Sequence, residues 1–229
     1  MSSTRPTAAS RRARADCASP AGEAVVQTPI QAVVFDIGNV LYNWDIGALY
    51  AKLIPDRSHR DWFLSHVVTP EWHFQHDRGR PSAETVPELQ AQFPAEADLI
   101  AAYVPRWLET ITGPVPGMLE IVAELDAAGV PLFGITNFAH EFWARFRPTA
   151  PVFDRFRDIV VSGTERLFKP EPEIYRLALR RFGLAPGDGM FVDDRIENVR
   201  GGVAEGFPGH HFTGAARLRA RLVGEGLLV

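Results

Sequence analysis

The stretch Val33-Val34-Phe35-Asp36-Ile37-Gly38-Asn39-Val40-Leu41 decides the fold of this chain. An apolar run ends in a carboxylate, and a Gly-Asn turn follows immediately. This pattern predicts a buried strand that delivers Asp36 to the rim of a sheet. A carboxylate at such a rim can serve as a nucleophile or as a metal ligand. Position 38, two residues further on, is a glycine, so the turn itself supplies no second carboxylate.

Length and composition limit the classes of protein to which the chain can belong. With 229 residues, 46% of them hydrophobic, it can bury one sizeable core, or one core and a small accessory subdomain. The formal net charge of -4 gives no electrostatic case for nucleic-acid binding. The single cysteine, Cys17, excludes an internal disulfide, and no apolar stretch approaches the ~20 residues of a membrane span. We therefore expect a cytoplasmic protein that binds neither nucleic acid nor membrane.

The first residues differ from the rest of the chain. Met1 to Thr28 are rich in Ser, Ala, Arg and Pro and contain no aromatic residue. Such a composition buries too little apolar surface to offset the entropy of ordering. Residues 1–29 are therefore predicted to be a disordered extension.

Short apolar runs alternate with longer amphipathic stretches beyond this extension. The runs have the length of buried parallel strands and lie at Ala32–Phe35, Pro131–Ile135, Ile159–Val161 and Met190–Val192. Helical patterns lie between them, at Met118–Leu125 and Ile174–Phe182, and each is followed by a glycine, Gly129 or Gly183. The alternation predicts an α/β fold with a doubly wound, Rossmann-like parallel sheet.

One insertion interrupts this alternation. Residues 46–113 contain no convincing strand, and they are too long for a connecting loop. Helical patterns occur around Ile46–Leu53, His59–Val67, Ala83–Phe93 and Leu99–Ile111. We expect a helical cap subdomain at 46–113 that covers the end of the first strand, and an α/β core domain formed by residues 30–45 and 114–229.

Polar residues also follow the other predicted strands. Thr136 and Asn137 end the second strand, Lys169 and Pro170 follow the third, and Asp193 and Asp194 end the fourth. Each feature alone has an ordinary explanation as a helix cap, a turn or a solvated side chain. In a doubly wound sheet, however, the carboxyl ends of the strands face one crevice, so these groups are expected to converge with Asp36.

The converging residue types suit phosphoryl transfer. A carboxylate can attack phosphorus, and a hydroxyl with backbone amides can hold the phosphoryl oxygens. An ammonium group neutralises charge shared by nucleophile and phosphate, and a further carboxylate can hold Mg²⁺. The joint pattern therefore predicts an enzyme site, whereas no single element would.

The motifs together resemble those of the haloacid dehalogenase superfamily. The resemblance rests on Asp-x-Gly-Asn-Val, Thr-Asn, Lys-Pro and Asp-Asp, the last followed by Asn198. It spans Ala32 to about Phe212, and the helical insertion lies where members with a first-type cap (subfamily IA) place it. FDIGNVLYNWD, ITNF, FKPEPEIY and FVDDRIENVRGG are similar, more narrowly, to the sugar-phosphatase branch, in which Gly-Asn after the nucleophile is a usual variant.

This resemblance implies a role for each motif residue. It implies Asp36 as nucleophile, Lys169 as its charge-balancing partner, and Thr136, Asn137 and Asn39 as substrate-binding residues. It further implies a Mg²⁺ cofactor held by Asp36, the backbone carbonyl of Gly38 and Asp194. Asp193 would be a supporting or alternate ligand, and Asn198 would orient the water shell of the metal or Lys169. The expected function is Mg²⁺-dependent hydrolysis of a small phosphomonoester, such as a sugar phosphate, through an aspartyl-phosphate, by a monomer or homodimer.

Gly38 departs from the majority pattern of the superfamily. Most of its phosphatases carry a carboxyl there that protonates the leaving oxygen and then activates water, a role worth about 10²- to 10⁴-fold in rate. Glycine can do neither. Asn39, Asp45 or a residue of the cap could compensate, or the enzyme could be slow.

Two other functions remain open from the sequence. A 2-haloacid dehalogenase also uses an Asp nucleophile and a Lys, but it needs no metal, and a carboxylate pair at 193–194 would repel its anionic substrate. A catalytically silent module that binds a phosphometabolite is the other alternative.

Substrate choice is expected to depend on the insertion. Trp72, His73, Phe74, His76 and Asp77 form a dense aromatic and polar cluster between two predicted helices, followed by a turn at Gly79. In one interpretation the aromatic residues pack the cap core and the histidines are solvated. In the other, some of the cluster lies over the phosphate-bearing group.

Overall fold

The computed structural model describes Met1 and residues 29–229 of the chain. The predicted disordered extension therefore lies almost entirely outside the described residues. None of the helices in the described part is long and apolar enough to cross a membrane.

A five-stranded parallel sheet forms the centre of the molecule. Its strand order is β5-β4-β1-β6-β7, and every neighbouring pair runs parallel. The strands are β1 (Ala32–Phe35), β4 (Leu132–Thr136), β5 (Asp158–Val161), β6 (Gly189–Asp193) and β7 (Gly209–His211). The predicted α/β doubly wound fold is confirmed, with the four predicted strands within one or two residues of their observed bounds.

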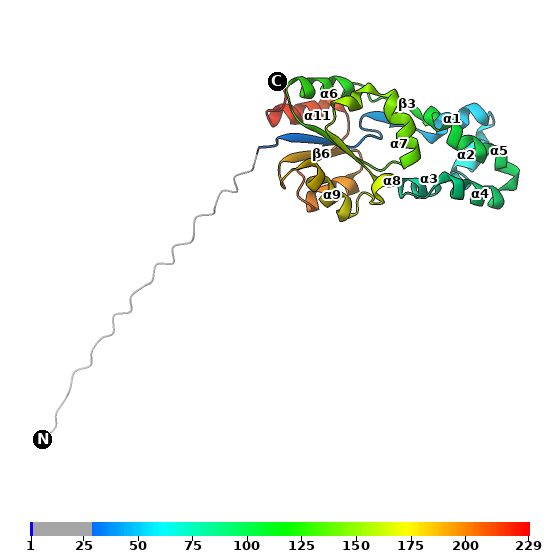
Figure 1. Ribbon diagram of the computed structural model, residues 1–229, viewed down its shortest axis with the longest axis horizontal. Coiled ribbons are helices and arrows are strands. Elements are labelled where there is room, and N and C mark those ends of the chain that lie inside the picture. Colours follow the sequence, from blue (N-terminus) through cyan, green and yellow to red (C-terminus); the bar gives the residue numbers. More distant parts are fainter. Residues whose placement is uncertain (2–28) are drawn as a thin grey trace.

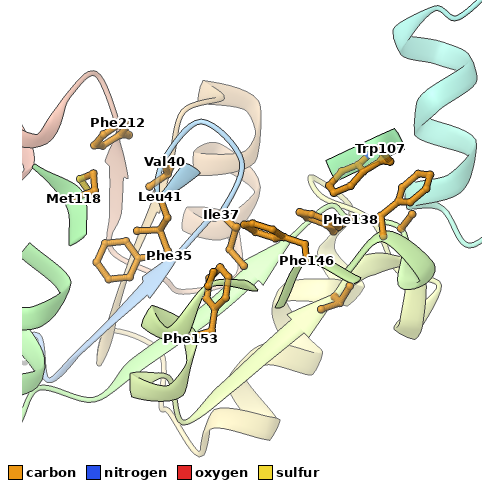
Figure 2. Packing of buried hydrophobic residues seen from close by; sticks show 14 of the residues in the cluster. Phe35, Ile37, Val40, Leu41, Trp107, Met118, Phe138, Phe146, Phe153 and Phe212 are labelled. Carbon is orange, nitrogen blue, oxygen red and sulfur yellow. The ribbon is translucent and has the colours of Figure 1, made fainter. Parts of the chain in front are cut away.

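Strand β1 lies in the middle of the sheet and contributes to both of its faces. Val33 and Phe35 belong to one buried cluster, whereas Ala32 and Val34 belong to the other, as the two-residue period of a strand requires. Figure 2 shows part of the first cluster, with Phe35 packed among aromatic and aliphatic side chains. A strand buried on both faces has few polar positions, so the polar residue that follows it stands at the sheet edge.

Helices cover both faces of this sheet. In Figure 1, α6 (Met118–Ala127) and α11 (Ala215–Gly224) lie on one side of it, and α9 (Pro172–Phe182) lies on the other. The remaining helices of the core are α7 (His140–Phe146), α8 (Ser162–Glu165) and α10 (Ile196–Ala204). Gly129 and Gly183 follow α6 and α9 with φ values of 74° and 66°, a left-handed conformation that ends a helix and suits glycine.

Five helices gather at one end of the molecule, beyond the sheet (Figure 1). They are α1 (Ile46–Leu53), α2 (Arg57–His66), α3 (Pro70–Asp77), α4 (Ser82–Gln92) and α5 (Ala97–Arg106), and we call them the cap helices. Short 3-10 turns occur at Pro94–Glu96 and Trp107–Thr110, and in the core at Arg147–Thr149 and Pro151–Arg155. The division of the chain at 46–113 stays a prediction.

The structure differs in three details from what was expected between the first strand and the helix near Pro116. Strands β2 (Tyr42–Trp44) and β3 (Ile111–Pro114) form an antiparallel pair, although no strand was expected in this part of the chain. The helix expected over Leu99–Ile111 ends at Arg106, because Ile111 pairs with Trp44 in this ribbon. Helix α3 was also missed, although Thr69 caps it by accepting a hydrogen bond from the Trp72 amide.

Candidate active site

Three adjacent strands bring the predicted polar residues together. Strand β1 pairs with β4 on one side and with β6 on the other. Asp36 directly follows β1, Thr136 is the last residue of β4, and Asp193 is the last residue of β6. Because the three strands are parallel, these residues meet at one edge of the sheet, at the crevice where doubly wound folds bind their ligands.

Lys169 joins two of these strand ends. Its Nζ lies 2.9 Å from Asp36 Oδ1 and 2.7 Å from Asp193 Oδ2, and it donates a third contact, of 2.9 Å, to the carbonyl of Ile135. The side chain is 1% exposed. A buried ammonium is tolerated because all three of its donors meet oxygen acceptors.

Two amide side chains hold this arrangement in place. Asn198 Nδ2 donates to both oxygens of Asp193, at 3.0 and 3.2 Å. The role expected for Asn198, orienting the water shell of a metal or Lys169, stays a prediction. Asn137 exchanges two hydrogen bonds with the backbone of Lys169, at 2.9 and 3.0 Å. The Asn137 carboxamide is therefore engaged in positioning Lys169, although the residue also lines the cavity described below.

Burial and charge shift the protonation of the site. Burial raises the pKa of Asp36, against the lowering effect of the Lys169 ammonium. Burial alone would lower the pKa of Lys169, but the charges of Asp193 and Asp36 outweigh it, so this pKa is raised. The pKa of Asp194 is also raised, first by burial and then by Asp193. The site thus holds more negative charge than its one ammonium balances, which favours binding of a cation.

Three carboxylates are close enough to hold one metal ion. Asp36, Asp193 and Asp194 each offer an oxygen, and these oxygens lie within 4.8 Å of one another. Asp193 already accepts hydrogen bonds from Lys169, Asn198 and the Arg195 amide. An oxygen-only donor set of this kind fits a hard divalent cation such as Mg²⁺.

One buried hydroxyl in the site has no partner. Thr136 is 1% exposed, and its Oγ1 makes no hydrogen bond to any described residue. An unpaired buried hydroxyl costs free energy unless a ligand or water satisfies it. Its position at the end of β4 therefore points to an oxygen-bearing ligand.

The turn after Asp36 contains one residue, Asn39, in an uncommon backbone conformation. Asn39 adopts a left-handed φ of 56°, and its Oδ1 accepts a 3.1 Å hydrogen bond from the Trp44 amide. The substrate-binding role expected for Asn39 stays a prediction. At Gly38, a Cβ would meet no atom within 4 Å, so steric crowding does not require glycine there.

A cavity of about 140 Å³ opens over these strand ends, between the sheet edge and the cap helices. One end is polar and contains Asp36, Lys169 and Asp194. The rest of the wall is dominated by apolar and aromatic residues: Ile37, Tyr42, Trp44, Phe74, Trp107, Ile111, Phe138 and Phe146. Figure 2 shows Ile37, Phe138, Phe146 and Trp107 gathered in this part of the molecule, and the Trp107 and Phe138 rings are 5.2 Å apart.

The aromatic cluster of the insertion divides between the cavity and the cap core. His73, Phe74 and Asp77 line the cavity. Trp72 and His76 do not; they are buried and pack against each other, with ring centroids 4.7 Å apart. The expectation of solvated histidines is wrong, because His73 and His76 are 5% and 1% exposed. The sequence signal for this helix is Thr69-Pro70, a capping residue followed by proline at the first helical position.

The family of the chain follows from comparison with known proteins. Residues 30–206 match the family model of the haloacid dehalogenase-like hydrolases. The chain therefore belongs to this family, as the motifs predicted.

Among curated relatives, the sesquiterpene phosphatase astK of Aspergillus oryzae is 26% identical over 189 residues, which cover 81% of this chain and 91% of the relative. Further relatives are also named phosphatases, for hexitol phosphates and phosphoglycolate. The family model identifies the chain as a hydrolase, and these relatives are phosphatases by name.

Solved structures of similar fold include phosphate-bound and dehalogenase members. The HAD family enzyme bt-2542 of Bacteroides thetaiotaomicron, in complex with magnesium and inorganic phosphate, matches with a TM-score of 0.63 and 20% identity, covering 81% of this chain and 95% of that chain. An L-2-haloacid dehalogenase of Xanthobacter autotrophicus matches with a TM-score of 0.57 and 20% identity, covering 87% and 85%. At these identities the two structures support the fold alone.

Proposed function

We propose that the protein is a Mg²⁺-dependent phosphatase that hydrolyses a small phosphomonoester through an aspartyl-phosphate on Asp36. One observation carries this proposal: a buried ammonium, Lys169, lies between Asp36 and Asp193 at 2.9 and 2.7 Å, at the same sheet edge as the unpartnered hydroxyl of Thr136. Three neighbouring strands bring Asp36, Thr136 and Asp193 together, and Lys169 reaches them from the segment between α8 and α9. This arrangement supports Asp36 as nucleophile, Lys169 as charge-balancing group and Thr136 as phosphate ligand.

Each residue of the site has a distinct task in this reaction. An oxygen of Asp36 attacks phosphorus, the bond from phosphorus to the alcohol oxygen breaks, and the phosphoryl group is left on Asp36. The Lys169 ammonium favours the ionised form of Asp36 against the effect of burial, and it offsets the charge of the incoming phosphate. The Thr136 hydroxyl donates a hydrogen bond to a phosphoryl oxygen, which satisfies the unpaired group. Water then attacks phosphorus and releases phosphate and the free carboxylate.

A divalent metal would bind at the acidic end of the site. Asp36 and Asp194, with the carbonyl of Gly38, would hold Mg²⁺, and the metal would supply positive charge that offsets the charge of the phosphate. Asp193, already bound by Lys169 and Asn198, would act mainly by orienting these ligands.

Removal of divalent cations is expected to abolish phosphate release. After EDTA treatment and desalting, hydrolysis of p-nitrophenyl phosphate should fall to background, and added Mg²⁺ should restore it. Asp194→Asn should raise the Mg²⁺ concentration needed for half-maximal rate by about tenfold or more, because one charged ligand becomes neutral. Activity is read from the release of nitrophenol across a Mg²⁺ titration.

Assays with and without Mg²⁺ also distinguish the two alternative functions from a phosphatase. Metal-independent halide release from 2-chloropropionate would favour a 2-haloacid dehalogenase. Binding of p-nitrophenyl phosphate without any product, with and without Mg²⁺, would favour a silent binding module. Either outcome would contradict the proposed function.

The residues of the cavity wall indicate which kind of alcohol the phosphate ester carries. Away from the strand ends its surface is mainly aromatic and aliphatic, and polar side chains on that side come chiefly from α3. A cavity of about 140 Å³ is close to the ~150 Å³ of an engineered apolar cavity that holds benzene. We therefore favour the monophosphate of an apolar, ring-sized alcohol, in keeping with the name of the sesquiterpene phosphatase relative. A sugar phosphate, as expected from the sequence, is the alternative.

A panel of phosphate esters separates these substrate classes. Benzyl phosphate should be hydrolysed with a kcat/KM at least about tenfold above glucose 1-phosphate or phosphoglycolate, since burying a ring contributes about 1.5–3 kcal/mol. Trp44→Ala should narrow this ratio, whereas Trp62→Ala should leave it unchanged, because Trp62 is 40% exposed on α2, away from the cavity lining. A higher kcat/KM for either polar ester would contradict the apolar preference.

A further inference from the structure

One carboxyl group in the cavity is not part of the four strand-end motifs. Asp77 is the last residue of α3, in the cap, and its side chain is buried. It lines the same cavity as Asp36 and Lys169. The cavity therefore has an acidic group on its cap side in addition to those at the sheet edge.

Buried polar side chains lie beside Asp77. His73, one turn earlier on α3, places its Nε2 3.6 Å from Asp77 Oδ2. Tyr103 of α5 is hydrogen-bonded through its hydroxyl to His73 Nδ1. The His73 ring stacks on Trp44, with centroids 4.7 Å apart, which restricts its orientation. His73 is thus a close neighbour of the Asp77 carboxyl, and Tyr103 orients the His73 ring. An imidazole that lies beside a carboxyl and is oriented by a third group is found at acid-base sites.

The surroundings of Asp77 favour its protonated form near neutral pH. Burial raises the pKa of Asp77 to about 8, although the backbone amide of Ala139 opposes the shift. Burial also lowers the pKa of His73 to about 3, so its imidazole is neutral. The titratable and charged groups that face Asp77 from its own helix, from α5 and across the cavity are His73, Tyr103, Asp36, Lys169, Asp194 and Arg195.

The other candidates for the missing acid-base group are less suitable. Gly38 has no side chain. The Asn39 carboxamide oxygen is occupied by the Trp44 amide. Asp45 is exposed, caps α1 by accepting from the Gly47 amide, and does not line the cavity.

We propose that Asp77 is the general acid and base of this phosphatase, supplied by the cap in place of the carboxyl that is absent at position 38. The inference rests on the proposed function of the same site. As the bond from phosphorus to the alcohol oxygen breaks, the Asp77 carboxyl gives its proton to that oxygen, and a neutral alcohol leaves. The Asp77 carboxylate then takes a proton from the water that attacks the aspartyl-phosphate, so that phosphate and ionised Asp36 are released and Asp77 is protonated again.

The first test compares two leaving groups in Asp77→Asn, which is nearly isosteric with the protonated acid. Benzyl alkoxide needs a proton to leave, so steady-state turnover of benzyl phosphate should fall by about 10²- to 10⁴-fold. Nitrophenolate leaves without help. With p-nitrophenyl phosphate, the variant should therefore release one equivalent of nitrophenol in a rapid burst and then turn over slowly, because water is no longer activated.

Two further variants show whether the effect belongs to acid-base chemistry. Asp61→Asn, at an exposed position on α2, should behave like the unmodified enzyme. Adding Gly38→Asp to Asp77→Asn should recover at least about tenfold of the benzyl phosphate activity, since a side chain at 38 meets no atom within 4 Å and restores a carboxyl to the site. No recovery in the folded double variant would count against the assignment.

The unmodified enzyme provides a measurement that does not depend on any variant. Its kcat/KM for benzyl phosphate should fall as the pH rises through the pKa of Asp77, about 8, while the rate of the nitrophenol burst should be less affected. Equal pH profiles for the two esters, wild-type turnover of benzyl phosphate by Asp77→Asn, or loss of the nitrophenol burst in that variant would each overturn the proposal. If Asp36→Asn were active, the proposed function itself would fail, whereas an inactive Asp36→Asn beside a fully active Asp77→Asn would overturn the role of Asp77 alone.

Discussion

Asp36→Asn is expected to lose about 10⁴-fold or more of its phosphatase activity while it remains folded, which is the scale of loss on removing a nucleophile. An amide oxygen cannot form the phosphoryl intermediate. The shape of the side chain is kept, and its oxygen can still accept the 2.7 Å hydrogen bond from the Ile37 amide. Lys169 retains Asp193 as an ionic partner. Activity is measured as phosphate released from p-nitrophenyl phosphate in excess Mg²⁺.

The control for this variant is Asp154→Asn. Asp154 lies in the 3-10 turn Pro151–Arg155, and its side chain is 65% exposed. Its replacement should leave the rate unchanged, because among the described residues its ion-pair partner is Arg147, at the surface. Deamidation of the introduced asparagine would regenerate Asp36, so the variant must first be shown to be free of deamidated protein. Residual activity above a few per cent in such a sample would exclude Asp36 as the nucleophile.

Lys169→Met should both abolish activity and destabilise the fold. The ammonium is 1% exposed and is the shared partner of Asp36 and Asp193. Removing one member of a buried ionic cluster leaves uncompensated charge and typically costs about 3–5 kcal/mol in the free energy of unfolding. Denaturant unfolding in the absence of divalent cations measures the loss, and p-nitrophenyl phosphate hydrolysis measures the activity.

The destabilisation of Lys169→Met should depend on pH in a defined direction. Without the ammonium, the folded-state pKa of Asp36 rises further above its unfolded value of 3.8. A carboxyl with a raised pKa contributes stability at low pH that is lost as the pH rises through the folded-state pKa, so the deficit should be smaller in mild acid than at neutral pH. Lys52→Met is the control, because Lys52 is 55% exposed in a surface pair with Glu109 and should change stability by less than about 1 kcal/mol. If the midpoint denaturant concentration for unfolding of Lys169→Met equalled that of the wild type, the stabilising role of the buried ionic cluster would be contradicted.

The core of the fold could be predicted from local patterns in the sequence. Strand β1 is a continuous apolar run that ends at Asp36, and parallel strands buried on both faces have this appearance. The convergence of Asp36, Thr136 and Asp193 then followed from topology, because parallel strands present their carboxyl ends at one edge. The structure brings these residues and Lys169 together as expected.

The parts of the insertion that escaped prediction depend on contacts far apart in the chain. Strand β3 contains glycine and proline, and it becomes a strand by pairing with β2 about 70 residues earlier, so its local sequence carries no strand signal. For the same reason, the relation of Asp77 to the site was not predictable. Its neighbours in space, Asp36 and Lys169, are distant in sequence, and only the folded cap places all three around one cavity.

Gly38 and Asp77 together suggest how this branch of the family manages without the usual acid-base carboxyl. In the proposed mechanism, the sheet edge supplies the nucleophile, the phosphate ligand and the metal ligands. Helix α3 of the cap supplies Asp77 for proton transfer, and the apolar wall beside the alcohol comes from the core, the β2–β3 ribbon and the cap together. With this arrangement, all the proposed catalytic groups meet only when the cap lies over the sheet edge. The residues of α3 would then contribute both to substrate binding and to proton transfer.

The covalent intermediate on Asp36 is the central claim, and rapid acid quenching tests it most directly. Enzyme mixed with a phosphate-labelled ester in the presence of Mg²⁺ is quenched during turnover, digested, and analysed for labelled peptides before and after treatment with hydroxylamine, which cleaves acyl phosphates. We expect label on the peptide that contains Asp36, its loss with hydroxylamine, its increase in Asp77→Asn, and none in Asp36→Asn. Label on a different peptide, or turnover by Asp36→Asn without any labelled peptide, would contradict the mechanism.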